Sequence, residues 1–181
     1  ASDRAQNHLV LGFAGLTVDD PDRDALEVVA QVLAGQGGRL FLELRDRQSL
    51  AYTVSASNLE GLAPGLFSVY IATAPEKTNA ALEGIHEELE RFFSEPPTDD
   101  ELVRSKRYLA GSFAVEQQRS AARAAHLALD GLYELGPESH LDYAQRVERV
   151  TKDDVLRVAQ RVLRLDAYTL ALVGDVDASS V

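Results

Sequence analysis

Two neighbouring segments with alternating side chains constrain the fold of this chain most strongly. In residues 51–59, Tyr52, Val54 and Ala56 alternate with small hydroxyl residues, and residues 66–74 alternate again with larger apolar side chains at every second position. Successive side chains of a strand point to opposite faces, so both segments are predicted to be strands. The sequence GLAPG between them is a turn signal. We therefore predict a hairpin of two adjacent antiparallel strands.

Elements before the hairpin alternate between strand and helix. The apolar run at residues 8–13 predicts a buried strand. Asp20 and Pro21 predict the N-cap and first residue of a helix whose apolar stripe ends at the glycines of residues 35–38. A short helix is expected over residues 39–46.

From residue 78 onward the apolar spacing is almost wholly helical, and a strand at residues 168–173 follows the last helix. Thr98 and Glu101 form a capping-box pattern, and Ser139 and Thr151 are expected to cap later helices. Hairpin-linked strands with helices gathered elsewhere predict an α+β fold, with a mostly antiparallel sheet covered by helices on one face. We expect residues 1–181 to form a single domain, as a piece of a longer protein.

Composition excludes several classes of function. The chain has 29 acidic and 18 basic residues, a net charge of −11, and no dense basic patch, so a nucleic-acid partner is not expected. It has no Cys, which removes disulfides, thiolate zinc sites and Cys nucleophiles. No apolar run reaches the roughly 20 residues that span a bilayer, so we expect a soluble chain, either cytoplasmic or periplasmic.

The residues alone predict no active site. The four histidines lack the i, i+4 spacing that would place two imidazoles on one helical face. His86 has Glu90 one turn away, and a lone His–Glu pair on a helix is usually a solvated contact. The acidic clusters at residues 19–22, 99–101 and 153–154 are predicted to cap helices. Residues 35–38 lack the pattern of a phosphate-binding loop, and no GxSxG motif is present. No metal site is predicted in this chain.

One stretch resembles a known family. Residues 37–56, GGRLFLELRDRQSLAYTVSA, resemble the signature of the C-terminal domain of insulinase/pitrilysin-type zinc peptidases, which include the mitochondrial processing peptidase. In that family a short helix carries an Arg, and the following strand carries a Tyr seven residues later. Arg45 and Tyr52 match this pair, and the flanking segments follow the same order over essentially the whole chain.

The resemblance implies one half of a two-part clamshell. The other half of such peptidases carries an HxxEH zinc motif, which this sequence lacks. Zinc is therefore expected in a partner domain or subunit, in a homodimer or heterodimer, and no catalytic residue is expected in this chain. The resemblance assigns Arg45 and Tyr52 to binding a peptide substrate for a zinc metalloendopeptidase, so the isolated domain should be inactive.

Other interpretations remain open at this point. Arg45 could be a surface residue beside the i, i+4 series of Arg39, Glu43 and Arg47, and Tyr52 could belong to the core. The chain could also be a proteolytically inactive scaffold or assembly subunit of the same fold, or a free-standing peptide-binding module.

Overall fold

The computed structural model describes residues 6–35, 37–136 and 138–175, and the structural statements below concern these residues. They contain a four-stranded antiparallel sheet in the order β2-β3-β1-β4. The strands are β1 (Asn7–Ala14), β2 (Thr53–Leu59), β3 (Leu66–Thr73) and β4 (Thr169–Val173). The predicted hairpin is confirmed, since β2 pairs with β3 in register from Thr53–Ala72 to Leu59–Leu66.

Helices fill most of the remaining described chain. The α-helices are α1 (Arg23–Ala34), α2 (Thr78–Ser94), α3 (Asp99–Glu116), α4 (Ser120–Leu132), α5 (Tyr143–Arg149) and α6 (Lys152–Val162). The shorter helical segments are the π-helix η1 (Phe41–Arg47) and the 3-10 turns η2 (Pro75–Lys77) and η3 (Ser139–Asp142). The predicted α+β class is therefore confirmed.

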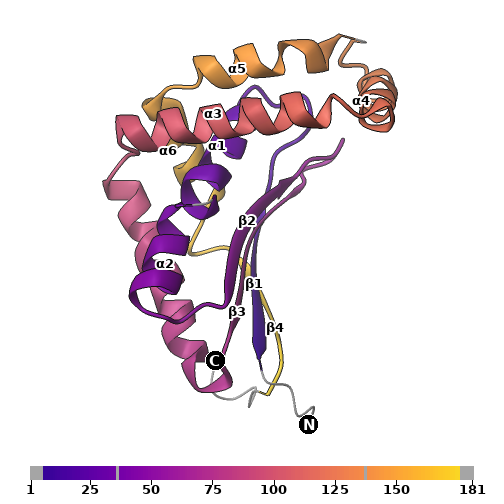
Figure 1. The fold of residues 1–181 in the computed structure, drawn as a ribbon. Helices are drawn as coiled ribbons and strands as arrows, with labels where there is room; N and C mark the ends of the chain where they lie inside the picture. The colour runs from indigo at the N-terminus through magenta and orange to yellow at the C-terminus, as the bar shows by residue number, and fades with distance from the viewer. Residues whose placement is uncertain (1–5, 36, 137, 176–181) are drawn as a thin grey trace.

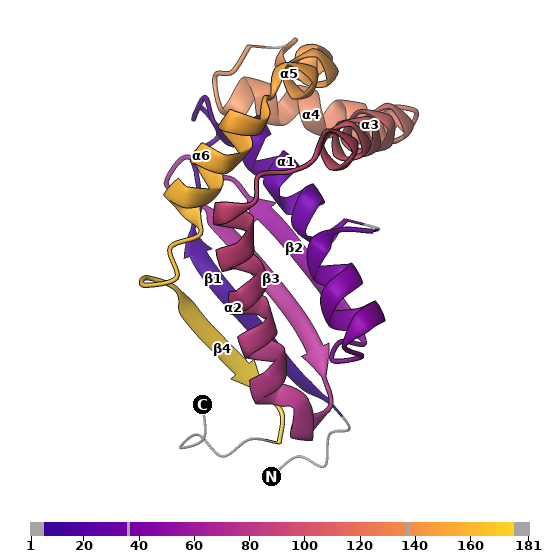
Figure 2. The same ribbon diagram turned by 90° about the vertical axis from the view of Figure 1, so that its left-hand side faces the viewer.

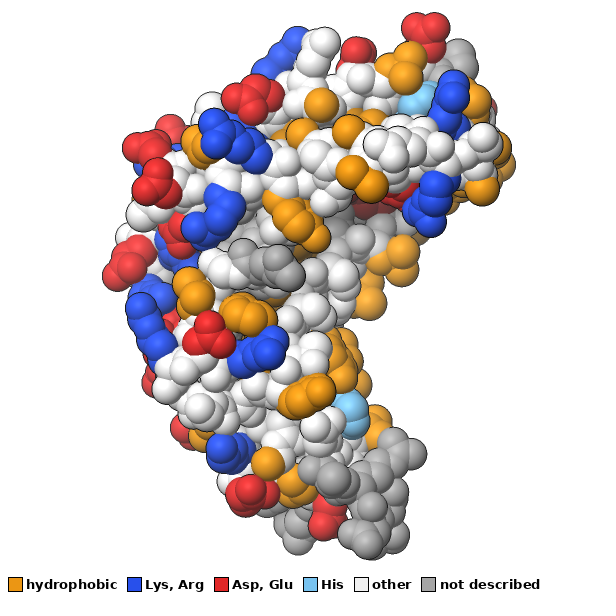
Figure 3. All heavy atoms as spheres, in the orientation of Figure 1, with side chains coloured by type: hydrophobic (Ala, Val, Ile, Leu, Met, Phe, Trp, Pro, Cys, Tyr) orange, Lys and Arg blue, Asp and Glu red, His pale blue; other side chains and the backbone are white. Residues whose placement is uncertain are grey.

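Helices cover only one face of the sheet. Figure 2 shows α1 and α2 lying across the sheet, with α6 beside their upper ends. Seen along its edge in Figure 1, the sheet has these helices on one side and none on the other, while α3, α4 and α5 extend beyond one end of the strands. The space-filling view in Figure 3 shows a crescent whose hollow side is the uncovered one.

The core lies between the sheet and the covering helices. One side of the strands contributes Leu9, Leu11, Phe67, Val69 and Ile71, all fully buried. The helices contribute the remaining large buried side chains, among them Leu26, Leu33, Ile85, Leu89, Phe92 and Val155. In the strands every second residue is buried, and in the helices burial recurs about every 3.6 residues, as the sequence patterns predict.

Two predicted helix caps are formed and two are not. Thr98 with Glu101, and Thr151 with Asp154, form complete capping boxes at α3 and α6. The prediction that Asp20 and Pro21 begin α1 is wrong, because the helix starts at Arg23 and residues 20–22 form turns. Ser139 does not cap a helix either: it is the first residue of η3, where no side-chain cap is formed.

The first acidic cluster has a different role from the one predicted. Asp20 and Asp22 bind arginines of α6, with Arg161 Nη2 2.7 Å from Asp20 and Arg157 Nη1 2.7 Å from Asp22. These carboxylates tie the loop before α1 to α6 instead of capping α1. The clusters at residues 99–101 and 153–154 do lie in the first turns of α3 and α6, as predicted.

Within the described ranges, no helix combines the length and the apolar character needed to cross a bilayer.

Candidate peptide-binding face

The uncovered side of the sheet carries no charged side chain. Strand pairing places the following residues on this side, which we call the open face: His8, Val10, Gly12, Ala14, Thr53, Ser55, Ser57, Leu59, Leu66, Ser68, Tyr70, Ala72, Thr169, Ala171 and Val173. None of these paired residues is Asp, Glu, Lys or Arg, although 26% of the chain is charged. Hydroxyl, apolar and aromatic side chains therefore form a formally neutral surface on the uncovered side of the sheet.

Side-chain hydrogen bonds order part of this open face. Ser57 and Ser68 lie on neighbouring strands with their hydroxyl oxygens 2.9 Å apart. His8 Nδ1 lies 2.8 Å from the Tyr70 hydroxyl, and the two rings stack with centroids 6.0 Å apart. These contacts leave the hydroxyl-bearing strands as a fixed surface that can also exchange hydrogen bonds with a ligand.

Arg45 lies on a wide helical turn that contacts β2 and α2. Its segment, η1, is a π-helix in which Gln48 N donates to Glu43 O, five residues earlier. Leu44 anchors η1 in the core above Gly84 of α2, where a Cβ atom would lie 2.5 Å from Leu44 Cδ2. Arg45 itself is exposed, and its guanidinium carbon lies 4.7 Å from the centroid of the Phe41 ring. The ring holds an exposed cation in a defined direction.

The turn from η1 to β2 is fixed by the carbonyl of Leu44, which accepts hydrogen bonds from both Leu50 N and Ala51 N. Ser49 there has a φ of 53°, and Lys77 Nζ donates to its carbonyl over 2.9 Å. Arg45 and Tyr52 are therefore presented from a well-supported segment, although among the described residues no hydrogen bond or ring contact joins the two side chains.

Tyr52 is 73% exposed, directly before the first residue of β2. Its backbone N–H donates to Ala72 O over 2.9 Å, so the main chain is fixed while the side chain meets solvent. The interpretation of Tyr52 as a core residue is therefore wrong. It has the strand parity of buried Val54, but it precedes an edge strand and its side chain is exposed. The substrate-binding roles of Arg45 and Tyr52 stay predictions.

Arg39 is a structural residue that the sequence did not reveal. It is only 8% exposed and donates to both carboxylate oxygens of Glu101, over 2.8 and 3.0 Å. It also donates to the carbonyls of Glu95 and Pro96 and lies over the Phe92 ring. Of the predicted i, i+4 series only Arg47–Glu43 forms, because Arg39 turns instead to the junction of α2 and α3. No local pattern predicts a pair 62 positions apart.

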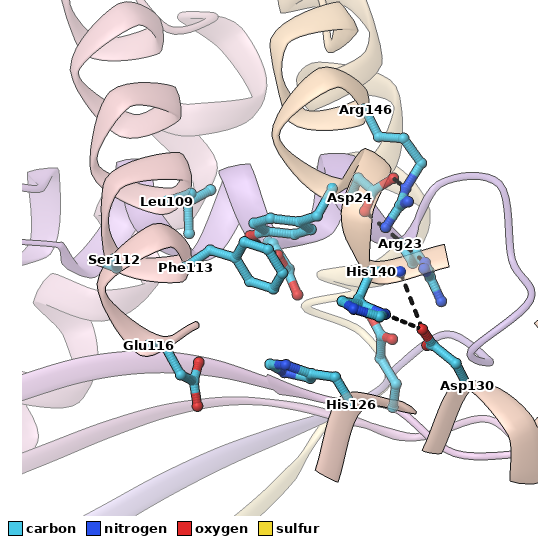
Figure 4. A pocket seen from close by; sticks show the side chains of 13 residues that line it. Arg23, Asp24, Leu109, Ser112, Phe113, Glu116, His126, Asp130, His140 and Arg146 are labelled. Atoms are coloured by element: carbon cyan, nitrogen blue, oxygen red, sulfur yellow. Dashed lines mark hydrogen bonds and ion pairs between the residues drawn. The ribbon is translucent and has the colours of Figure 1, made fainter. Parts of the chain in front are cut away.

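A cavity of about 440 Å³ lies beneath α4, between α1, α3, α5 and the end of β2. We call it the α4 cavity; Figure 4 shows its lining. Asp130 of α4 accepts hydrogen bonds from the backbone N–H of His140 and lies 2.7 Å from its Nδ1. The ring of His126 stacks on that of His140, with centroids 6.0 Å apart. Sequence spacing did not predict this cavity, because its residues come from segments far apart in the chain.

Each of the two histidines of the cavity has one ring nitrogen in a hydrogen bond. Nδ1 of His140 is engaged by Asp130, and Nδ1 of His126 lies 2.6 Å from the amide nitrogen of Gln117. Across the described part of the chain, no three His, Asp or Glu side chains are grouped to hold a metal ion. His86, on α2, packs edge-on against Tyr168.

Two carboxyl groups of the cavity have unusual acidities. Burial, with the nearby charge of Glu27 as a second cause, raises the pKa of Glu60 to about 7. Burial also raises the pKa of Glu27, against the hydrogen bond from the Tyr143 hydroxyl, which lowers it. Both groups are thus poorly solvated as anions.

Glu60→Gln is expected to stabilise the fold at alkaline pH. A carboxyl whose pKa rises on folding loses its contribution to stability as pH increases from the ordinary value of 4.5 to about 7. The variant should exceed the wild type by on the order of 1 kcal/mol at pH 8, after discounting for partial solvent screening, and the advantage should vanish by about pH 4. Urea unfolding at several pH values measures it, and a pH-independent difference would contradict the assignment.

Known proteins match most of this chain in sequence and in fold. Residues 2–109 match the family model described as the peptidase M16 inactive domain. A zinc protease of Streptomyces coelicolor is 34% identical over 160 residues, covering 87% of this chain and 35% of that protein. The alpha subunit of the mitochondrial processing peptidase of Caenorhabditis elegans is 28% identical over 181 residues, covering 93% of this chain and 34% of that protein.

Solved structures agree with the sequence relatives. The peptidase M16 inactive domain from Pseudomonas fluorescens superimposes with a TM-score of 0.84 at 27% identity, over 93% of this chain and 41% of that one. The chain thus spans well under half of the length of the curated relatives it matches.

Proposed function

Because this chain belongs to the M16 peptidase family, as a member of its inactive-domain group, we propose that it is the substrate-binding half of a zinc metalloendopeptidase. It pairs with a homologous domain or subunit that carries HxxEH and supplies the zinc. In this division of roles the present chain binds and orients a peptide and activates no water.

The open face is the observation that carries this proposal. An extended peptide presents backbone N–H and C=O groups, and the hydroxyls of Ser55, Ser57 and Thr169 can donate to or accept from such groups. The paired residues of the face carry no fixed charge, so they neither repel nor attract acidic or basic peptide side chains. A neutral, hydroxyl-rich and concave sheet therefore suits a varied polypeptide.

Arg45 and Tyr52 are the residues we assign to holding the reacting segment. Arg45 offers planar, permanently charged donors suited to peptide carbonyls or a terminal carboxylate. The Tyr52 hydroxyl is the candidate donor to the scissile carbonyl as negative charge develops on its oxygen. Their exposure on a fixed turn supports these roles, since both can reach a ligand without unfolding any element.

The outer surface of α4 supports the need for a partner half. The helix exposes Leu127, Leu129 and Leu132, of which Leu129 and Leu132 lie three positions apart on one face, and Val115 and Leu141 are exposed as well. Figure 3 shows hydrophobic side chains gathered on this lobe at the tip of the crescent. Exposed apolar clusters of this kind are typical of interaction sites. Since the relatives are more than twice as long as this chain, we assign the α4 surface to contact with the zinc-bearing half.

Mixing the chain with its zinc-bearing half tests the proposal. Each part alone should leave a fluorogenic peptide library intact, and the mixture should cleave it. The double variant Leu129→Ser/Leu132→Ser should weaken association at least about tenfold, as followed by calorimetry, because two exposed leucines that the partner would cover lose apolar contact area. The matched control is Leu62→Ser, which alters an exposed leucine outside α4.

Two results would overturn the proposal. Tightly bound zinc that supports cleavage by the isolated chain would place catalysis in this chain itself. A natural partner half without HxxEH would instead favour the scaffold role. Equal weakening by the Leu62 and α4 variants would remove the assignment of the α4 surface alone.

A further inference from the structure

We propose that the α4 cavity binds an organic cation, namely a guanidinium or primary alkylammonium group. The group could belong to a small molecule or to a basic side chain of a polypeptide, since the chemistry of recognition is the same. This inference goes beyond the proposed function and does not depend on it, because the cavity lies among helices and neither Arg45 nor Tyr52 lines it.

Charge in the cavity favours a cation. Five acidic residues line it, Asp24, Glu27, Glu60, Glu116 and Asp130, against two arginines. Both arginines are already engaged: Arg146 Nε lies 2.8 Å from Asp24 and its Nη1 donates to Ser139 O, while Arg23 donates to Val18 O. An anionic ligand would therefore meet an excess of carboxylates that the local arginines do not offset.

Two of these carboxylates have only neutral donors. Glu27 accepts a hydrogen bond from the Tyr143 hydroxyl, and Glu60 accepts one from the Asn58 amide over 3.1 Å. Within the described residues neither forms an ion pair. Burial raises the pKa of both carboxyl groups, and the nearby charge of Glu27 raises the pKa of Glu60 further. A cation between Glu27 and Glu60 would stabilise both anions. It would supply the positively charged partner that buried carboxylates usually have.

Aromatic rings complete the site. Phe113 packs between Tyr143 and His126, with ring centroids 4.6 and 5.4 Å away, so the three rings form a continuous wall. A guanidinium or ammonium group is attracted to the face of such rings and to carboxylates at their edge. The cavity volume of about 440 Å³ is in the range of small-ligand sites and exceeds what one ordered water would need. Figure 4 shows Phe113, His126 and Glu116 directed toward the same space.

Binding of two probes tests the inference. Agmatine represents a free small cation, and the N-acetylated, C-amidated peptide Gly-Gly-Arg-Gly-Gly represents a basic side chain, with the same capped peptide carrying citrulline as its neutral counterpart. Titrations by calorimetry and by NMR shifts at low salt should show saturable binding of agmatine, the arginine peptide or both. The citrulline peptide should bind at least about tenfold more weakly, because it lacks the positive charge.

Matched charge variants locate the site. The double variant Glu27→Gln/Glu60→Gln should lower the affinity for the probe at least about tenfold. It should still fold, since each substitution removes a poorly solvated anion. Glu83→Gln/Glu87→Gln removes the same charge from exposed positions of α2 and should leave binding unchanged. Binding of the peptide alone would identify a polypeptide as the source of the cation, and binding of agmatine alone would identify a small molecule. Failure of both probes, or equal weakening by the two double variants, would overturn the inference.

Discussion

Replacing Arg39 with methionine is expected to lower the free energy of unfolding by about 3 kcal/mol, because it leaves the Glu101 carboxylate without its cation in a largely buried site. The guanidinium also satisfies the carbonyls of Glu95 and Pro96, which end α2 and lead into α3. Methionine keeps much of the apolar stem of arginine, so the decrease in the free energy of unfolding measures mainly the loss of the polar contacts. For a chain of this size the midpoint should fall by about 6–12 °C in calorimetry.

The matched control is Arg47→Met. Arg47 pairs with Glu43 at the same 2.8 Å separation, but its side chain is 69% exposed, so the expected change is at most about 0.5 kcal/mol. Similar losses for the two variants would show that the buried network around Arg39 contributes no more than a surface pair.

Acid dependence provides an independent check on the Arg39 network. The hydrogen bond from Arg39 holds the pKa of Glu101 at about 2, below its ordinary value of 4.5. A carboxyl whose pKa falls on folding stabilises the folded state above the ordinary value, and this stabilisation is lost as pH falls toward 2. The gap between wild type and Arg39→Met should therefore be full at pH 7 and shrink below about pH 4. A constant gap would contradict this origin.

Replacing Tyr52 with phenylalanine is expected to lower kcat of the assembled peptidase about 100-fold while changing KM little. This follows if the hydroxyl donates to the carbonyl oxygen mainly as charge develops in the transition state, a loss of about 3 kcal/mol. Arg45→Ala should instead raise KM most, because it removes binding present before the reaction. Steady-state kinetics on one fluorogenic peptide separates the two effects.

Stability and a second tyrosine serve as controls for Tyr52. Since the side chain is 73% exposed, Tyr52→Phe should change unfolding free energy by at most about 0.5 kcal/mol. Tyr108→Phe removes a hydroxyl from another exposed tyrosine, on α3, and should keep full activity. Unchanged kcat in Tyr52→Phe, with the partner half present and active, would remove the role assigned to this hydroxyl.

Local patterns predicted the parts of the fold that depend on neighbours in sequence. Alternation defined β2 and β3, and the Thr98–Glu101 and Thr151–Asp154 boxes marked the starts of α3 and α6, because each signal involves residues at most a few positions apart. The start of α1 was placed too early because Asp20 and Asp22 are drawn to arginines about 140 positions away. Such tertiary competition is not visible in a local pattern.

The candidate site likewise has parts that the sequence predicted and parts that only the structure showed. The resemblance supplied Arg45 and Tyr52, and the structure shows both to be accessible on a fixed turn. Period-2 spacing in each strand could have shown that one side lacks charge, but only strand pairing joins four such sides into one surface. The Arg39 network and the α4 cavity required contacts between distant segments. Their members carry no shared sequence signal.

If the proposed peptidase forms as we infer, the neutrality of the open face has a consequence for the products of its cleavage. A polypeptide lying on it finds no ionic group to fix its register, so alignments displaced by two residues, which return the same side of an extended chain to the sheet, should be close in energy. Digestion of one long substrate should then yield nested fragments whose ends are staggered, instead of a single pair of cuts.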